Sequence, residues 1–138
     1  MTDAAIIARI ADKLLEHDEV TRRLGLKIDS VGPGRAVMRM KVAKKHMNAL
    51  GVCHGGMIAT LADTAMALAA NSHNFVAMTQ HISFDNLAPV QLGETLVATA
   101  VEVSREGRGA IYDVEVRSGD ALIALARGRT RATSMTHF

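Results

Sequence analysis

Residues 55–72 read GGMIATLADTAMALAANS, and this stretch decides how the rest of the chain is organised. Alanine, leucine and methionine fill most of its positions, so a helix drawn through it is apolar on nearly every side. A helix that is apolar nearly all round is typical of a protein interior. We therefore predict a buried helix from Gly55 to about Ser72, around which the other elements pack.

The segments on both sides of this helix have the patterns of strands and of one amphipathic helix. Before it we predict a helix over about residues 3–17, a helical turn over 20–24, strands over 26–31 and 35–42, and a loop over 44–53. After it we predict strands over about 75–84, 94–104, 108–117 and 121–133. This order indicates an α+β fold in which an antiparallel sheet wraps the central helix. We expect one domain over residues 1–138, with its core at about 24–133.

Composition excludes several classes of function. The net charge of +2 is too small to indicate a nucleic-acid or membrane partner, and the near absence of aromatic residues argues against base stacking. The single cysteine, Cys53, cannot form an internal disulfide, which favours a reducing compartment. The start of the chain does not resemble a signal peptide, and no apolar run is long enough to span a bilayer. We expect a cytoplasmic protein.

The paired glycines Gly55 and Gly56 stand where the central helix begins. The first amides of a helix have no acceptor inside it, and the helix dipole favours negative charge there, so this end can hold an anion or a developing oxyanion. A tight turn without any ligand is the alternative. A phosphate-binding P-loop is excluded because Met57 and Ile58 occupy the places of its Lys and Ser/Thr.

Asp63 is the most unusual residue of the central helix. Its neighbours three and four positions away are apolar residues or Thr60, so no cation on the same helix can pair with it. A buried carboxylate without partners is costly, and such groups concentrate at functional sites. The alternative is that Asp63 emerges at an exposed edge or bonds to nearby backbone.

Other catalytic arrangements find little support. The six histidines have no metal-ligand spacing and there is one cysteine, so we expect no metal site. There is no G-x-S-x-G motif for a serine hydrolase. Cys53 next to His54 raises the possibility of a nucleophilic thiol, although adjacent residues rarely point at one another.

Two motifs in this region carry a resemblance to a known family: Asn48-x-x-Gly51-x-x-His54-Gly55-Gly56, and Leu61-Ala62-Asp63-Thr64-Ala65. Together they resemble the hotdog-fold acyl-CoA thioesterases, and among these the phenylacetate-degradation (PaaI-like) group related to the THEM-type enzymes. The downstream stretches that share the resemblance are Phe84–Pro89, Leu92–Glu94 and Arg105–Arg108. The similarity covers about residues 24–132.

The resemblance implies a long helix wrapped by a five- to six-stranded antiparallel sheet, and a hydrolase that cleaves acyl-CoA to the free acid and CoA. It also implies homodimers that join their sheets, dimers that pair into homotetramers, and active sites at the dimer interface. In such a site the helix amide and the carboxylate come from different subunits.

The resemblance further assigns roles to residues. The Gly55 amide would polarise the thioester carbonyl, and Asp63 would act as nucleophile or as general base. Supporting roles would fall to Asn48, His54 and the hydroxyl of Thr79. Gly56 and Thr64 are expected to bind substrate. As a basic surface for the CoA phosphates the candidates are Arg105 and Arg108, and also Arg129 and Arg131; the alternative for all four is a solvated strand face or loop. No metal or redox cofactor is expected, because CoA is part of the substrate.

Two alternatives stay open from the sequence. A hotdog hydratase or dehydratase pairs a histidine with an acidic residue, and His54 with Asp63 imitates that pair. A non-catalytic acyl-CoA-binding module would bind the ester unchanged. Aryl, hydroxylated aryl and medium-chain aliphatic acyl groups all suit a pocket of small and methionine side chains.

Overall fold

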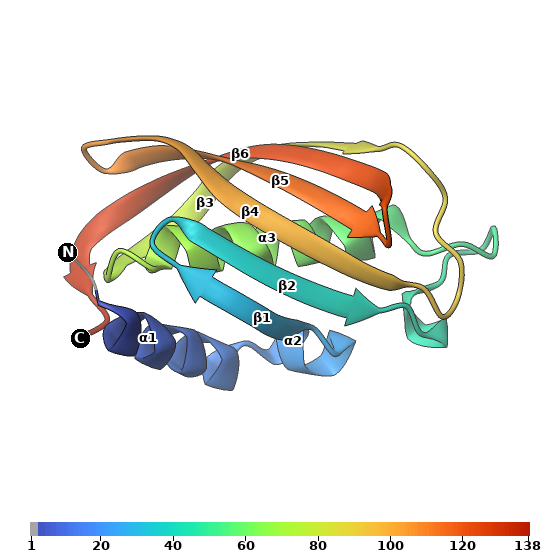
Figure 1. Ribbon diagram of the computed structural model, residues 1–138, viewed down its shortest axis with the longest axis horizontal. Helices are drawn as coiled ribbons and strands as arrows, with labels where there is room; N and C mark the ends of the chain where they lie inside the picture. The colour runs from blue at the N-terminus through green and yellow to red at the C-terminus, as the bar shows by residue number, and fades with distance from the viewer. Residues whose placement is uncertain (1–2) are drawn as a thin grey trace.

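The computed structural model describes residues 3–138 (Figure 1). Its helices are α1 (Ala4–His17), α2 (Glu19–Leu24) and α3 (Gly55–Asn71), with a short 3-10 turn, η1 (Lys44–His46). Its strands are β1 (Lys27–Gly32), β2 (Arg35–Lys41), β3 (Phe75–Asn86), β4 (Thr95–Glu106), β5 (Gly109–Ser118) and β6 (Ala121–Thr136). They form one antiparallel sheet in the order β1-β2-β4-β5-β6-β3. The predicted α+β fold is confirmed, with six strands.

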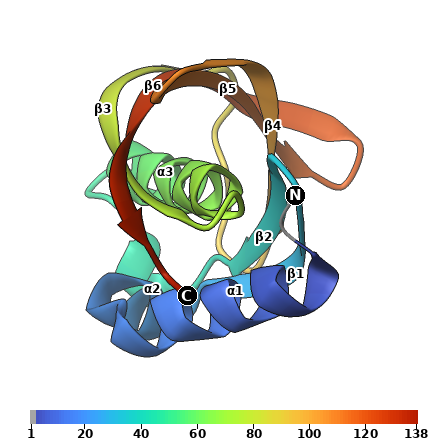
Figure 2. The ribbon, with the colours of Figure 1, turned by 90° about the vertical axis from the view of Figure 1, so that its left-hand side faces the viewer.

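The sheet curls around α3, as the end-on view in Figure 2 shows. The helix buries Leu61, Ala65 and Met66 completely. The strands contribute several fully buried alanines to the same core, namely Ala36, Ala98, Ala100 and Ala124. Small side chains on the sheet let the helix approach closely, so the core consists of bulky helix residues packed on a smooth sheet surface.

Gly128 on β6 lies at a very close approach between the sheet and α3. A Cβ added at Gly128 would lie 2.3 Å from both the sulfur and the terminal methyl of Met66, and 3.1 Å from the carbonyl oxygen of His81. Met66 is fully buried, so its side chain has little room to move aside. Only glycine therefore fits at this position while Met66 fills the core.

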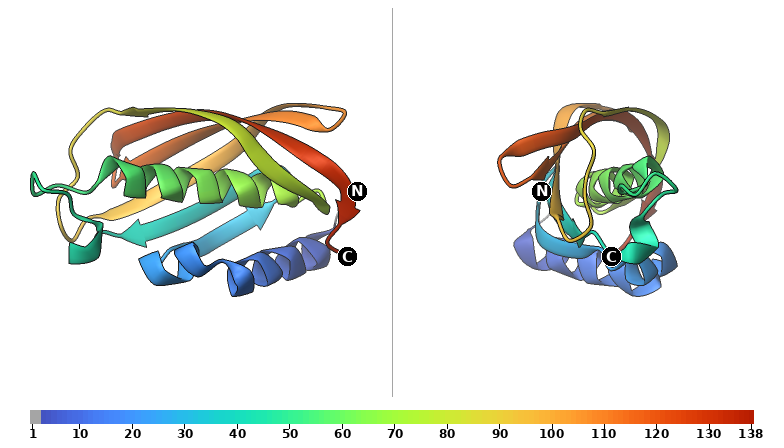
Figure 3. Two further views of the ribbon diagram at one scale, coloured as in Figure 1. Left: turned by 180° about the vertical axis from the view of Figure 1, so that it is seen from behind. Right: turned by 90° about the vertical axis from the view of Figure 1, so that its right-hand side faces the viewer.

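The expectation that α3 is buried on every side is wrong for the single chain. Asp63 and Gly56 are exposed, and a stripe of partly exposed small or threonine residues joins them: Ala59, Thr60, Thr64 and Ala67. The sheet covers α3 from one side only, and Figure 3 shows the helix from the side that no strand covers. Apart from Asp63 its residues are small or threonine, which is why the stripe resembled core in the sequence.

The N-terminal helix α1 lies across the open side of the curled sheet, near β1 (Figures 1 and 2). The Asp3 side chain caps it by accepting from the Ile6 amide at 2.8 Å, and α1 buries Ile7 and Ile10. The predicted boundaries of α1 hold to within one residue. In the part of the chain that the structure describes, no helix is both long and apolar enough to cross a membrane.

We predict that Gly128→Val lowers the free energy of unfolding by about 1–3 kcal/mol, because it overpacks the core against Met66. Urea unfolding followed by circular dichroism measures the change. The matched control is Gly32→Val, since no atom lies within 4 Å of a Cβ at Gly32. The double variant with Met66→Ala should recover part of the loss, and equal effects at both glycines would contradict this packing argument.

Candidate active site

The first turn of α3 leaves one amide free. His54 is the N-cap, and its ring Nδ1 accepts a hydrogen bond from the Gly56 amide at 3.0 Å. The amides of Met57 and Ile58 donate to the His54 carbonyl oxygen at 2.9 and 3.3 Å. The Gly55 amide has no acceptor among residues 3–138, so it is the first-turn donor available to a ligand. Because His54 occupies the Gly56 amide, the predicted substrate contact of Gly56 would have to use another part of that residue.

Gly55 lines a cleft of about 300 Å³ together with Asn48 and Asn86. The Asn48 Oδ1 accepts from the amides of Leu50 and Val52 at 2.9 and 3.2 Å, which closes the loop before α3. The amide nitrogen of the Asn48 side chain is therefore the group left for a role in the cleft. The cleft thus combines the free Gly55 amide with the side-chain amide of Asn48.

Asn86 was not among the predicted site residues. A Cβ on Gly55 would lie 2.8 Å from the Asn86 Nδ2, so the Asn86 carboxamide rests directly on the Gly55 backbone. A side chain at position 55 would displace this carboxamide from the Gly55 backbone. The stretch Phe84–Pro89, which shares the family resemblance, contains Asn86, but the contact itself depends on where β3 ends relative to α3.

Asp63 has a hydrogen-bond partner on another element. The Thr79 hydroxyl, on β3, donates to the Asp63 Oδ1 at 2.9 Å. The Asp63 carboxylate is exposed on the open stripe of α3, so the prediction of a buried carboxylate without partners is corrected on both points. The alternative of an exposed edge describes the single chain.

Gly55 and Asp63 lie too far apart in one chain to act on one thioester. They are eight residues apart on the same helix, which corresponds to about 12 Å along its axis. An oxyanion donor must lie about 3 Å from the carbonyl oxygen, and a base or nucleophile about 3–3.5 Å from its reacting atom. The same separation keeps His54 away from Asp63, so these two cannot form a hydratase pair within one chain.

Cys53 does not have the environment of a nucleophile. It is buried, and burial raises the pKa of its thiol, so the thiol stays protonated at neutral pH. Its sulfur lies 3.8 Å from the His54 carbonyl oxygen, and the His54 ring instead caps α3.

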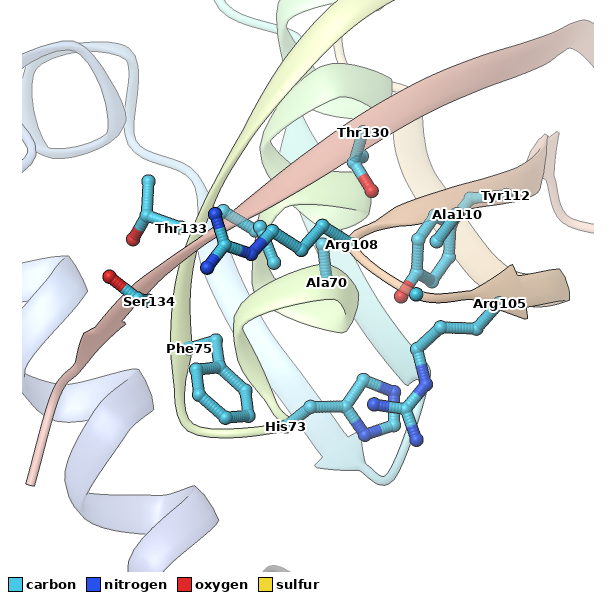
Figure 4. A pocket seen from close by; sticks show the side chains of 13 residues that line it. Ala70, His73, Phe75, Arg105, Arg108, Ala110, Tyr112, Thr130, Thr133 and Ser134 are labelled. Carbon is cyan, nitrogen blue, oxygen red and sulfur yellow. The ribbon is translucent and has the colours of Figure 1, made fainter.

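The remaining predicted substrate-binding residues lie away from the Gly55 cleft. The Thr64 hydroxyl donates to the Thr60 carbonyl oxygen at 2.7 Å, next to Asp63 on the open stripe. Arg105 and Arg108 flank a separate cavity near the C-terminal end of α3 (Figure 4). The last pair, Arg129 and Arg131, lies exposed on β6, where it alternates with buried positions.

Comparison with protein families matches residues 50–124 to the thioesterase superfamily. The chain is also 38% identical over 122 residues to the acyl-coenzyme A thioesterase PaaI of Escherichia coli, covering 87% of this chain and 86% of that one. The chain belongs to the thioesterase superfamily. Human acyl-coenzyme A thioesterase 13 is 33% identical to this thioesterase over 103 residues, with 71% and 73% of the two chains covered.

Solved structures agree with this membership. The E. coli PaaI protein from the phenylacetic acid degradation operon superposes on this thioesterase with a TM-score of 0.91 at 34% identity, covering 94% of this chain and 95% of that one. A Streptococcus mutans protein bound to acetyl CoA gives a TM-score of 0.77 at 28% identity, with 80% and 90% covered. The fold is the hotdog fold, and the protein is an acyl-CoA thioesterase, as the sequence motifs predicted.

We predict that His54→Ala lowers the free energy of unfolding by about 1 kcal/mol, because it removes the N-cap of α3. His54→Asn should retain most of that stability, since asparagine also accepts from helix amides at an N-cap. Urea unfolding of the two variants measures the difference. Equal stability of His54→Ala and the parent protein would show that the hydrogen bond to Gly56 contributes nothing.

Proposed function

We propose that this thioesterase hydrolyses an aryl- or medium-chain acyl-CoA at a site built by two subunits, with Gly55 from one and Asp63 from the other. The observation that carries the proposal is the placement of the free first-turn amide and of the carboxylate on one helix, about 12 Å apart. One chain supplies both groups but cannot bring them to the same carbonyl. In a dimer, the Gly55 amide of each subunit would be completed by Asp63 of the partner subunit.

The geometry of the open face supports a homodimer. β3 is an edge strand of the sheet, and an edge strand of 12 residues offers unpaired backbone groups to another strand. The exposed stripe of α3 carries Asp63, which bonds to Thr79 on this same strand. A two-fold axis near the middle of the stripe would set Gly55 against Asp63 of the partner subunit, and would do so twice. We propose that such dimers pair further into a homotetramer.

The proposed reaction needs few groups. The thioester carbonyl oxygen accepts from the Gly55 amide, which stabilises the negative charge that develops as the carbonyl is attacked. Asp63 of the partner subunit either attacks the carbonyl carbon itself or takes a proton from the attacking water. The carbon–sulfur bond breaks, CoA leaves as its thiolate, and water supplies the oxygen of the acid. This chemistry uses no metal and no redox cofactor.

The neighbouring side chains would orient these groups. The Thr79 hydroxyl holds one oxygen of Asp63, which leaves the other oxygen for water or for the carbonyl carbon. Asn48 lines the same cleft as Gly55, and its amide nitrogen would donate to the incoming carboxylate or to the water. His54 acts through the helix backbone, since its ring holds the Gly56 amide and leaves the Gly55 amide free.

The relatives support the proposed substrate class. The named relatives are acyl-coenzyme A thioesterases, and the operon of E. coli PaaI concerns phenylacetic acid degradation. We propose aryl or medium-chain acyl groups for this chain, with the CoA phosphates bound by Arg105 and Arg108 or by Arg129 and Arg131. A reducing, cytoplasmic location accords with the lone, buried Cys53.

We predict that Asp63→Asn leaves the fold intact and lowers hydrolysis of phenylacetyl-CoA by at least about 100-fold, because it removes the base or nucleophile. Release of the CoA thiol measures the rate, and circular dichroism with thermal unfolding checks the fold. The matched control is Asp29→Asn, which removes a carboxylate from a surface ion pair with Arg39 on the β1–β2 hairpin. Full activity of Asp63→Asn would refute the proposal.

We further predict that two inactive variants complement each other. Gly55→Val blocks the amide end of the site, because its side chain would fill the space beside the Gly55 amide that Asn86 now borders, and Asp63→Asn disables the carboxylate end. The two proteins, denatured together and refolded, would form mixed dimers that carry one intact site. An equal mixture should regain about a quarter of the parent activity, since half of the dimers are mixed and each has one of two sites. If both groups acted within one chain, the mixture would stay as inactive as its components.

A further inference from the structure

Another cavity, partly open to solvent, lies toward the opposite end of α3 from Gly55. It has a volume of about 310 Å³ and is walled by buried alanines of α3, β3 and β5, namely Ala70, Ala77 and Ala110 (Figure 4). Phe75 closes one side. At about 30 Å³ for each water in the liquid, the space corresponds to roughly ten waters, so it can accept one small organic molecule.

Thr130 projects an unused polar group into this cavity. The residue is 2% exposed, and its hydroxyl makes no hydrogen bond to any of residues 3–138. Figure 4 shows the hydroxyl pointing toward the cavity from β6. The hydroxyl is not sealed off, since among residues 3–138 the fully enclosed side-chain oxygen without a partner is that of Thr21, so the Thr130 hydroxyl meets the open space of the cavity. The inner wall therefore offers a hydrogen-bonding group to a ligand.

The rim of the cavity is cationic. Arg105 and Arg108 stand there with exposed side chains, and within residues 3–138 their one ion pair joins Arg105 to Glu102 at 3.7 Å. Glu102 accepts from the Tyr112 hydroxyl at 2.9 Å and contacts the His73 ring at 2.8 Å, so it is shared among three partners. Desolvation, and then the hydrogen bond to Glu102, raise the pKa of Tyr112, so its hydroxyl remains a donor. Two guanidinium groups thus face the one carboxylate of Glu102, so the rim keeps a net positive charge that can bind an anion.

We propose that this cavity binds a hydroxyaryl carboxylic acid, with its ring hydroxyl on Thr130, its ring against the alanines and Phe75, and its carboxylate on Arg105 and Arg108. The Thr130 hydroxyl, the apolar wall and the cationic rim of the cavity match the hydroxyl, the ring and the carboxylate of such a molecule. Thr130 pairs with Ala110 across the sheet, and Arg108 lies two residues before Ala110, which is about 7 Å along the chain. A single ring with substituents at opposite ends spans such a distance.

The bound acid would be the product of the reaction and would inhibit the enzyme. This role of the acid rests on the proposed function. Thioester hydrolysis releases a carboxylic acid, and the same two arginines are among those proposed for the CoA phosphates. A bound acid would withhold them from the next substrate. Thr130 is also the register partner of Thr79, which holds Asp63, so the inner end of the cavity lies one strand away from the carboxylate. This makes the cavity a feedback site separate from the Gly55 cleft.

The test compares two acids that differ by one hydroxyl. Calorimetry should show that 4-hydroxyphenylacetate binds the parent protein about fivefold more tightly than phenylacetate, the value of one net hydrogen bond. Thr130→Val should remove that preference, because valine keeps the shape and loses the hydroxyl. Thr99→Val, on β4 and outside the cavity lining, is the matched control and should keep it. A preference that persists in Thr130→Val, or its absence in the parent, overturns the proposal.

A second measurement locates the ligand without relying on any cavity variant. In protein with ¹³C-labelled alanine methyls, the acid should shift Ala70, Ala77, Ala110 and Ala132, which line the cavity, and leave Ala88 beside the Gly55 cleft unchanged. Shifts confined to Ala88, or no shift of the four cavity alanines at saturating acid, would overturn the assignment. The same shifts should occur in Asp63→Asn, so loss of hydrolysis in that variant and failure of acid binding are separate results.

Discussion

The spacing of two groups along α3 is the constraint on which the rest of this structure depends. A helix of 17 residues is rigid, and it fixes the Gly55 amide and the Asp63 carboxylate about two turns apart. No rotation of side chains closes such a gap, because one of the two groups belongs to the backbone. The uncovered stripe, the edge strand β3 and the Thr79 hydroxyl lie around the middle of this helix, on the face where we propose that a second subunit binds.

The sheet determines how deeply α3 sits and where space is left over. At Gly128 the absence of a side chain admits Met66, and the core is filled. Nearer the end of the helix, Ala70 lines the cavity together with Ala77 and Ala110, so the helix presents a small side chain where Met66 fills the core elsewhere. Protein interiors are otherwise close-packed, and the cavity, which opens to solvent, is the space that these small side chains leave. The same smooth strand surface thus produces both the tight contact and the cavity.

The elements could be predicted well from the sequence, because their patterns are local. The apolar run and the paired glycines located α3, and alternation located the strands. The environment of Asp63 was misjudged, since the small and threonine residues around it resemble core residues whether a sheet or another subunit covers them. Asn86 and Thr130 went undetected, because their roles depend on the register of β3 and β6. The roles of Gly55 and Asp63 were predicted from the family resemblance, because the local sequence pattern alone left these roles open.

The cap of α3 explains why one amide, and not several, serves the cleft. His54 reaches the Gly56 amide with its ring, while its carbonyl oxygen takes the amides of Met57 and Ile58. Every donor of the first turn is thereby satisfied except Gly55, and the positive end of the helix dipole coincides with that single N–H. A carbonyl oxygen arriving there meets one fixed donor that needs no reorganisation as charge develops. In the proposed site the histidine would therefore act by satisfying the Gly56 amide and leaving that of Gly55 free, without contacting the substrate.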